Sequence, residues 1–197
     1  MTSTSDAVVA GLLLTGGASR RLGRDKATVA FGGERCAARV AGVLATVARP
    51  VLEIGPGVSG LRSVPDAQPG AGPLAALVTG CRALGTERTG IPVLVLACDV
   101  PLVTAALLRL LATWPGTGSA VPLVDGRPQP LCARFSAAAV ARATAALAGG
   151  ERSLRPLLAS PDVELLDASV WGPVADPVVF VDIDTPEDLA RVEAVLG

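Results

Sequence analysis

Histidine and tyrosine are absent from this chain of 197 residues, which holds only three phenylalanines and two tryptophans. The absence of histidine excludes histidine-based catalytic triads, histidine-ligated zinc and a histidine general base. The scarcity of aromatic rings argues against the stacking platforms that bind single-stranded nucleic acid. The chemistry that remains uses carboxylates, basic side chains, backbone amides or thiols.

A net charge of either sign is also lacking. The 17 lysines and arginines nearly balance the 18 aspartates and glutamates, while 50% of the residues are hydrophobic. This hydrophobic fraction excludes a disordered chain, and the balanced charge creates no general field that attracts nucleic acid or a membrane surface. We therefore expect neither as a partner, and an anionic ligand must be held by a local site.

Cysteine motifs and long apolar runs are missing as well. The four cysteines lie too far apart for a C-x-x-C metal site or a dense disulfide framework. We predict that all four are buried as small apolar residues: Cys36, Cys81, Cys98 and Cys132. No apolar run approaches the ~18 residues of a membrane span, and residues 1–6 lack the basic residues of a targeting segment. The expected location is cytoplasmic.

The chain length predicts one domain over residues 1–197, with residues 1–6 flexible, because a typical domain has ~150 residues. Short apolar runs alternate with segments of helical spacing, a pattern that predicts an α/β sheet with crossover helices. The predicted strands are residues 7–14, 50–54, 93–97, 119–124, 130–135 and 178–183. The predicted helices are residues 34–48, 73–84, 102–113, 136–147 and a last helix that opens at residues 185–188. Thr185 is the predicted N-cap of that last helix, with Asp188 three residues beyond it, and Asp125-Gly126 is a predicted turn.

A glycine-rich, basic loop, L-T-G-G-A-S-R-R-L-G-R-D-K, follows the first predicted strand at residues 14–26. Ligands of open α/β sheets bind beyond the carboxyl ends of the strands, and Gly16 and Gly17 can bring backbone amides close to phosphate oxygens. The loop also supplies four cations: Arg20, Arg21, Arg24 and Lys26. These features predict a triphosphate site, although the spacing is not that of a Walker loop. The alternative is a solvated basic loop, in which the four cations would repel one another.

Residues 55–60, G-P-G-V-S-G, formally match the G-x-G-x-x-G signature of dinucleotide folds. That signature requires a helix at this point, whereas the sequence that follows is broken by Pro65 and Pro69. We predict an ordinary surface loop.

Several acidic residues are candidates for binding a nucleotide or a metal ion. Asp99 leaves a buried strand and could hold Mg²⁺ against nucleotide phosphates, or it could cap the next helix. Asp182 and Asp184 could add a second oxygen ligand, or serve as turn or cap residues. Asp66 could accept hydrogen bonds from a ribose hydroxyl or a base edge, or belong to a turn.

A second cationic loop at residues 150–155 could receive a phosphate at a helix N-terminus, or Ser153 could be an ordinary N-cap. This loop and residues 122–134 are the predicted acceptor side of the site.

These segments together resemble the MobA-type molybdenum cofactor guanylyltransferases of the GT-A-like nucleotidyltransferase superfamily. The resemblance rests on L-x-G-G-x-S-x-R-x-G-x-D-K at 14–26, G-P-L-A at 72–75, C-D-x-P at 98–101, G-E-R-S-L at 150–154 and D-x-D-T-P-E-D-L at 182–189. It implies a single-domain, three-layer α/β/α fold with a Rossmann-like, mostly parallel sheet of the nucleotide-diphospho-sugar transferase type. It also implies Mg²⁺-dependent transfer of GMP from GTP to molybdopterin in the molybdenum cofactor, with release of pyrophosphate.

The resemblance also assigns roles to individual residues. The residues implied in nucleotide binding are Leu14, Thr15, Gly16, Gly17, Lys26, Asp66 and Asp99. The residues implied in catalysis are Arg21, Lys26 and Asp99. The implied metal ligands are Asp99 and, more weakly, Asp184. Apart from the resemblance, we expect Arg152 and Ser153 of the second cationic loop to bind the acceptor.

Two positions depart from the family pattern, because Thr15 stands where the family more often has Ala and Asp184 where many members have Asn. The double glycine favours guanine over cytosine. The implied partners are GTP, the molybdenum cofactor and, transiently, cofactor-insertion proteins or molybdoenzymes. The alternatives are a cytidylyltransferase, another nucleotidyltransferase for small-molecule phosphates, and a non-catalytic nucleotide-binding module.

Overall fold

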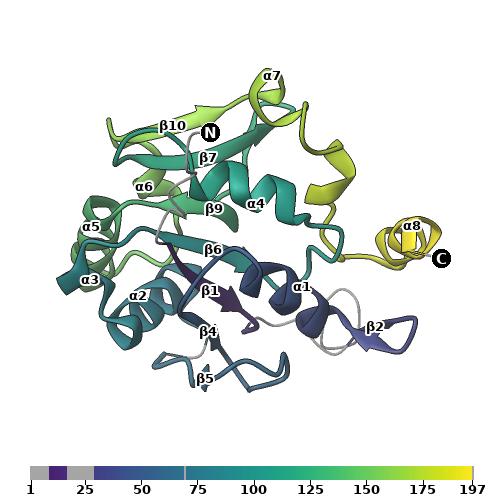
Figure 1. The fold of residues 1–197 in the computed structure, drawn as a ribbon. Coiled ribbons are helices and arrows are strands. Elements are labelled where there is room, and N and C mark those ends of the chain that lie inside the picture. The colour runs from purple at the N-terminus through teal and green to yellow at the C-terminus, as the bar shows by residue number, and fades with distance from the viewer. Residues whose placement is uncertain (1–8, 17–28, 69, 197) are drawn as a thin grey trace, which may run out of the picture.

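The computed structural model describes residues 9–16, 29–68 and 70–196, apart from the side chains of residues 87 and 88. Their main feature is an eight-stranded sheet in the order β10-β7-β9-β6-β1-β4-β5, with β8 beside β7 (Figure 1). Its strands are β1 (Ala10–Leu14), β4 (Val51–Ile54), β5 (Ser63–Val64), β6 (Val93–Ala97), β7 (Ser119–Val124), β8 (Arg127–Pro128), β9 (Cys132–Phe135) and β10 (Val163–Leu166). A separate hairpin joins β2 (Ala30–Phe31) to β3 (Glu34–Arg35).

Helices cover both faces of this sheet, so that the described residues form three layers (Figure 1). The helices are α1 (Cys36–Ala45), α2 (Pro73–Leu84), α3 (Thr86–Thr89), α4 (Ala105–Ala112), α5 (Ala137–Ala148), α6 (Arg155–Leu158), α7 (Ala168–Trp171) and α8 (Pro186–Leu196), with a 3₁₀ helix, η2 (Pro177–Phe180). Leu13 and Leu96 pack into the core under α1 and α4, whereas Leu12 and Val95 pack into the core under α2 and α5. Because β1 and β6 are covered on both sides, their sequences are continuous apolar runs.

The strand directions confirm the mostly parallel sheet. β1 runs parallel to β4 and β6, β4 parallel to β5, and β7 parallel to β10. β9 runs antiparallel to both β6 and β7. The carboxyl ends of β1, β4, β6 and β7 therefore lie along one edge of the sheet.

Several element predictions are confirmed. α2 begins at Pro73 as predicted, and all four cysteines are buried. Thr185 and Asp188 form the reciprocal cap of α8: the Asp188 amide donates to Thr185 Oγ1 at 3.2 Å, and the Thr185 amide donates to Asp188 Oδ2 at 2.9 Å. Asp125 and Gly126 form a turn with φ of 47° and 73°, which joins β7 to β8.

The strand predicted at residues 178–183 is wrong. Pro177 and Val178 open the 3₁₀ helix η2, and Asp176 Oδ1 accepts a hydrogen bond from the Val178 amide at 2.9 Å. The apolar run is nevertheless buried, since Phe180 packs edge-on against Trp171 with ring centroids 5.1 Å apart. Burial explains the hydrophobic pattern, which does not by itself distinguish a strand from a short helix.

Several predicted boundaries also shift. Residues 34 and 35 belong to β3, so that α1 begins at Cys36. α4 begins at Ala105, because Thr104 Oγ1 accepts a hydrogen bond from the Leu107 amide at 3.3 Å. β9 begins at Cys132. Among the described residues, no helix combines the length and apolar character that a membrane span requires.

Candidate active site at the carboxyl edge of the sheet

The chain adds strands on both sides of β1, first β4 on one side and then β6 on the other. The candidate site lies at the carboxyl end of β1. Leu14 is in register with Ile54 of β4 on one side and with Ala97 of β6 on the other. The Thr15 amide donates to the Ile54 carbonyl at 3.1 Å, and the Cys98 amide donates to the Leu14 carbonyl at 3.1 Å. The segments that follow these three strands are therefore neighbours at a topological switch point, where open α/β sheets bind their ligands.

The end of β1 presents backbone rather than side chains at this edge. Leu14 and Thr15 are buried, whereas Gly16 is exposed. A Cβ at Gly16 would lie 4.0 Å from Asp66 Oδ2, so that the structure brings Asp66 beside the glycine. Asp66 Oδ1 also accepts a hydrogen bond from the Gln68 amide at 3.0 Å. One oxygen of Asp66, Oδ1, thus takes part in a turn, and the other, Oδ2, lies near Gly16.

Three carboxylates gather where the segment after β6 meets the segment before α8. Asp99, Asp182 and Asp184 each offer one oxygen, and these oxygens lie within 4.8 Å of one another. The Ile183 amide donates to the Asp99 carbonyl at 3.0 Å and so ties the segment before α8 to the end of β6. Hard carboxylate oxygens at this spacing fit a divalent cation such as Mg²⁺.

The alternative roles of these aspartates as helix caps are not what the structure shows. Thr104 is the N-cap of α4, the helix after Asp99. Thr185 and Asp188 cap α8, and the Asp184 backbone amide donates to Asp188 Oδ2 at 3.2 Å. Neither Asp99 nor Asp184 is the cap of the helix that follows it. Gly17, Arg21 and Lys26 lie outside the described residues.

Sequence reasoning missed Glu53, which is fully buried within β4. Its Oε1 accepts hydrogen bonds from Thr15 Oγ1 at 2.7 Å and from the amides of Gly57 and Val58 at 2.8 and 3.0 Å. Its Oε2 accepts from the Ser59 amide at 2.9 Å and from Ser59 Oγ at 2.5 Å. A glutamate inside the apolar run V-L-E-I was the signal that could have identified it.

These hydrogen bonds determine the ionisation of Glu53. Burial raises the pKa of its carboxyl, but the hydrogen bonds from Ser59, Thr15 and Val58 outweigh burial and lower the pKa below its ordinary value. The same bonds engage the amides of residues 57–59. The G-x-G-x-x-G match at residues 55–60 therefore uses these donors internally and is not followed by a helix, as predicted.

The loop at residues 150–155 lies against the start of α2. The Leu74 amide donates to the Arg152 carbonyl at 3.2 Å, and a Cβ at Gly72 would lie only 2.5 Å from that carbonyl oxygen. Glu151 Oε1 accepts from the amides of Arg152 and Ser153 at 2.8 and 2.9 Å. These two backbone donors are thus engaged by a carboxylate of the same loop. The exposed Arg152 and the half-buried Ser153 offer their side chains instead.

Ser153 is not the N-cap that the sequence suggested. Leu154 occupies the N-cap of α6, and Ser153 Oγ accepts a long hydrogen bond from the Arg155 amide at 3.4 Å. α6 has only four residues.

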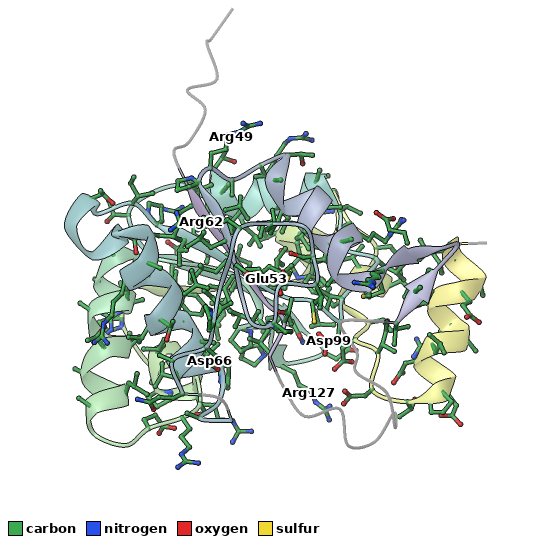
Figure 2. The ribbon with its side chains drawn as sticks, turned by 90° about the horizontal axis from the view of Figure 1, so that it is seen from below. Arg49, Glu53, Arg62, Asp66, Asp99 and Arg127 are labelled. Atoms are coloured by element: carbon green, nitrogen blue, oxygen red, sulfur yellow. The ribbon has the colours of Figure 1, made fainter. Side chains whose placement is uncertain are left out.

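The β7–β8 hairpin carries a cation to the same edge of the sheet. Arg127 is exposed directly after the turn at Asp125 and Gly126. Figure 2 shows Arg127, Asp99 and Asp66 toward one end of the molecule and Arg49 at the other. The hairpin lies on the β7 side of Asp99, whereas Asp66 lies on the β5 side.

Thiol chemistry is excluded at the two cysteines whose pKa is strongly shifted. Burial, helped by the negative charge of Asp99, raises the pKa of Cys36 to about 12. Burial alone raises the pKa of Cys132 to about 12. Both thiols are therefore protonated at neutral pH and do not act as nucleophiles.

A three-layer α/β domain with a glycine at the end of β1 and a carboxylate cluster after β6 belongs to the nucleotide-binding class. The MobA-like NTP transferase domain matches residues 11–165 of the chain. This chain belongs to the MobA-like NTP transferase family and is a nucleotidyltransferase. The resemblance stated from the sequence motifs is thereby confirmed.

Relatives with similar sequences cover almost the whole chain. A probable molybdenum cofactor guanylyltransferase of Chloroflexus aggregans is 32% identical over an alignment of 205 residues that covers 96% of this chain and 96% of that one. One from Deinococcus radiodurans is 34% identical over an alignment of 187 residues that covers 91% of this chain and 91% of that one.

Solved structures confirm the fold class. Molybdopterin-guanine dinucleotide biosynthesis protein A of Archaeoglobus fulgidus superposes with a TM-score of 0.79 at 22% identity, over 95% of this chain and 98% of that one. The 2-C-methyl-D-erythritol 4-phosphate cytidylyltransferase of Thermus thermophilus superposes with a TM-score of 0.66 at 22% identity, over 96% and 98% of the two chains. Likeness at these identities concerns the fold alone.

Proposed function

We propose that this nucleotidyltransferase moves GMP from GTP to the terminal phosphate of molybdopterin in the molybdenum cofactor and releases pyrophosphate. The observation that carries the proposal is the convergence of Asp99, Asp182 and Asp184 after β6, the strand that pairs with β1 at the switch point. The names of the sequence relatives support the choice of cofactor and of guanine. The double glycine at residues 16 and 17 supports guanine as well.

The reaction requires positioning and charge neutralisation rather than a protein nucleophile. An oxygen of the acceptor phosphate attacks the α-phosphorus of GTP and forms the new P–O bond. The bond between that phosphorus and the bridging oxygen breaks, and the electron pair leaves with pyrophosphate. The absence of histidine is therefore compatible with this chemistry.

Different groups of the chain bind the nucleotide and the metal ion. The backbone at Leu14, Thr15 and Gly16 borders the nucleotide, and Asp66 accepts hydrogen bonds from it. Asp99, Asp182 and Asp184 are the residues that would hold Mg²⁺, which when bound supplies positive charge to the phosphates.

The assignments of Gly17, Arg21 and Lys26 follow the family pattern. Gly17 and Lys26 bind the nucleotide as well, and Lys26 and Arg21 neutralise phosphate charge. The acceptor lies toward the β7 side of Asp99, where Arg127 is exposed, with Arg152 and Ser153 as further contacts. The cytoplasmic location and the transient contacts with cofactor-insertion proteins or molybdoenzymes stay predictions.

Ligand-induced stabilisation tests the choice of nucleotide. Purified protein is heated with GTP, CTP or ATP, each with and without Mg²⁺, and the melting temperature is recorded. A ligand that binds only the folded state raises this temperature. We expect a shift confined to GTP with Mg²⁺, and a shift confined to CTP would assign the chain to the cytidylyltransferases instead.

Turnover separates the enzyme from a simple nucleotide-binding module. Pyrophosphate is measured with GTP, Mg²⁺ and the molybdenum cofactor, and sugar phosphates serve as alternative acceptors. Release with the cofactor alone supports the proposal. Pyrophosphate release with a sugar phosphate alone would make the sugar phosphate the acceptor. A protein that binds GTP but releases no pyrophosphate with any of these acceptors would be a non-catalytic nucleotide-binding module.

A further inference from the structure

Glu53 lies behind the nucleotide site, where the transfer reaction itself has no use for a carboxylate. We infer that Glu53 is a positioning residue, which fixes the end of the nucleotide-binding strand β1 through the hydroxyl of Thr15. The inference rests on the proposed nucleotide site at Gly16.

The Glu53 carboxylate joins two loops that are far apart in the sequence. Its Oε1 accepts from Thr15 Oγ1 at 2.7 Å, and so contacts the segment that follows β1. Its Oε2 accepts from Ser59, at 2.9 Å from the amide and 2.5 Å from the hydroxyl, in the loop after β4. A fully buried carboxylate is costly unless its oxygens are hydrogen-bonded, and the bonds to both loops meet this requirement.

Thr15 is held by its backbone and its side chain together. Its amide donates to the Ile54 carbonyl at 3.1 Å, while its hydroxyl donates to Glu53. The next residue, Gly16, is exposed and lies beside Asp66. The peptide between a fixed Thr15 and an exposed Gly16 is thus pre-organised to meet a ligand.

The loop after β4 is shaped to permit this contact. Gly55 has a φ of +149°, and a Cβ there would lie 2.1 Å from Thr15 Oγ1. Any other residue at position 55 would push the Thr15 hydroxyl away from Glu53. The glycine and the glutamate therefore act together on the same side chain.

The two hydroxyls on Glu53 form a matched pair for an experiment. Thr15 Oγ1 and Ser59 Oγ each donate to this carboxylate, but only Thr15 belongs to the nucleotide-binding segment. Thr15→Val and Ser59→Ala each remove one donor. A purely structural role of Glu53 predicts equal effects on nucleotide binding, whereas a positioning role predicts an effect for Thr15 alone.

The test measures the melting temperature, the Kd for GTP with Mg²⁺, and KM and kcat. Both variants should lower the melting temperature to a similar extent. Thr15→Val should weaken GTP binding roughly tenfold, as the loss of one hydrogen bond to a charged group permits, with KM raised more than kcat is lowered. The Kd of Ser59→Ala for GTP should stay within about twofold of the wild-type Kd, a much smaller change than the tenfold change expected for Thr15→Val. Thr15→Ser should recover most of the affinity, because it keeps the hydroxyl.

Glu53→Gln is the direct variant. Its amide NH₂ would face at least one donor that then lacks an acceptor, and it should lose both stability and GTP affinity. Equal GTP affinities for Thr15→Val and Ser59→Ala would overturn the inference, even if Glu53→Gln does not fold. A wild type that binds no nucleotide would overturn the proposed function and this inference with it. A wild type that binds GTP while Thr15→Val binds it as tightly would overturn the inference alone.

Discussion

Replacing Gly55 with alanine tests how closely the loop after β4 must approach Thr15. The added Cβ would lie 2.1 Å from Thr15 Oγ1 and 3.2 Å from the Gly16 amide nitrogen. Contacts below 3.0 Å require something to move, and here the atom that must move is the hydroxyl bound to Glu53. The backbone adds its own cost, since a φ of +149° is rarely adopted by residues with a side chain.

The size of the effect follows from these two causes. The unfavourable backbone conformation costs about 1–3 kcal/mol in the free energy of unfolding. The overlap with Thr15 costs a further amount of about 1–3 kcal/mol, typical of overpacking. Thr15→Ala removes the overlapping oxygen, so that the double variant keeps the backbone cost and the 3.2 Å contact with the Gly16 amide nitrogen but not this overlap. The free energy of unfolding of the double variant should therefore be about 1–3 kcal/mol higher than the sum of the two single-variant effects predicts.

Urea denaturation of the wild type, both single variants and the double variant measures this coupling energy. Gly60→Ala is the matched control, because Gly60 lies in the same loop with a φ of +85° and, among the described residues, no atom beyond its chain neighbours lies within 4 Å of an added Cβ there. It should show the backbone cost alone and no coupling to Thr15. A Gly55→Ala substitution that costs the same with and without the Thr15 hydroxyl would refute the close approach described above.

Three further predictions concern the site and its ionisation. Asp99→Asn should lower the rate of pyrophosphate release by about 10²–10³ and change the Kd for GTP only a few-fold, because the charge at this edge stabilises the transition state most. Equal losses in the rate of pyrophosphate release and in the affinity measured by GTP titration would contradict this. Arg127→Ala should raise the KM for the molybdenum cofactor about tenfold and leave the KM for GTP unchanged, whereas Arg82→Ala, an exposed control on α2, should change neither. Glu53 has a lowered pKa in the folded state, so its charge stabilises the fold above its ordinary pKa of 4.5 and this contribution is lost as the pH falls below that value. The stability gap between the wild type and Glu53→Gln should therefore narrow in acid, and a gap that stays constant in urea titrations would argue against an ionised Glu53.

The elements that the sequence predicted well have strong local signals. α2 carries Pro73 in its first turn and a regular apolar face, and α8 carries the Thr185 and Asp188 cap. The run at residues 178–183 has only an apolar character, which η2 satisfies by burial without joining the sheet. Such short apolar runs are where a hydrophobic pattern stops distinguishing between structures.

The candidate site was predictable in part for the same reason. Asp99 and Gly16 follow apolar strands, and the carboxyl ends of parallel strands share one edge. Asp66 was predicted from the sequence as a nucleotide contact, with a turn as the alternative, and its place beside Gly16 comes from the pairing of β4 with β5. Glu53 was missed, because its partners lie in two separate loops.

The sequence by itself determined the α/β class, the cap of α8, the exclusion of histidine chemistry and the loops that could meet a nucleotide. These properties depend on composition and on interactions between residues a few positions apart. The tertiary structure decided that Asp182 and Asp184 lie beside Asp99 and that the Thr15 hydroxyl donates to Glu53. It also decided that the backbone amides of residues 57–59 donate to the Glu53 carboxylate. Those contacts depend on strand order and register, which the packing of the whole chain selects and which no local stretch encodes.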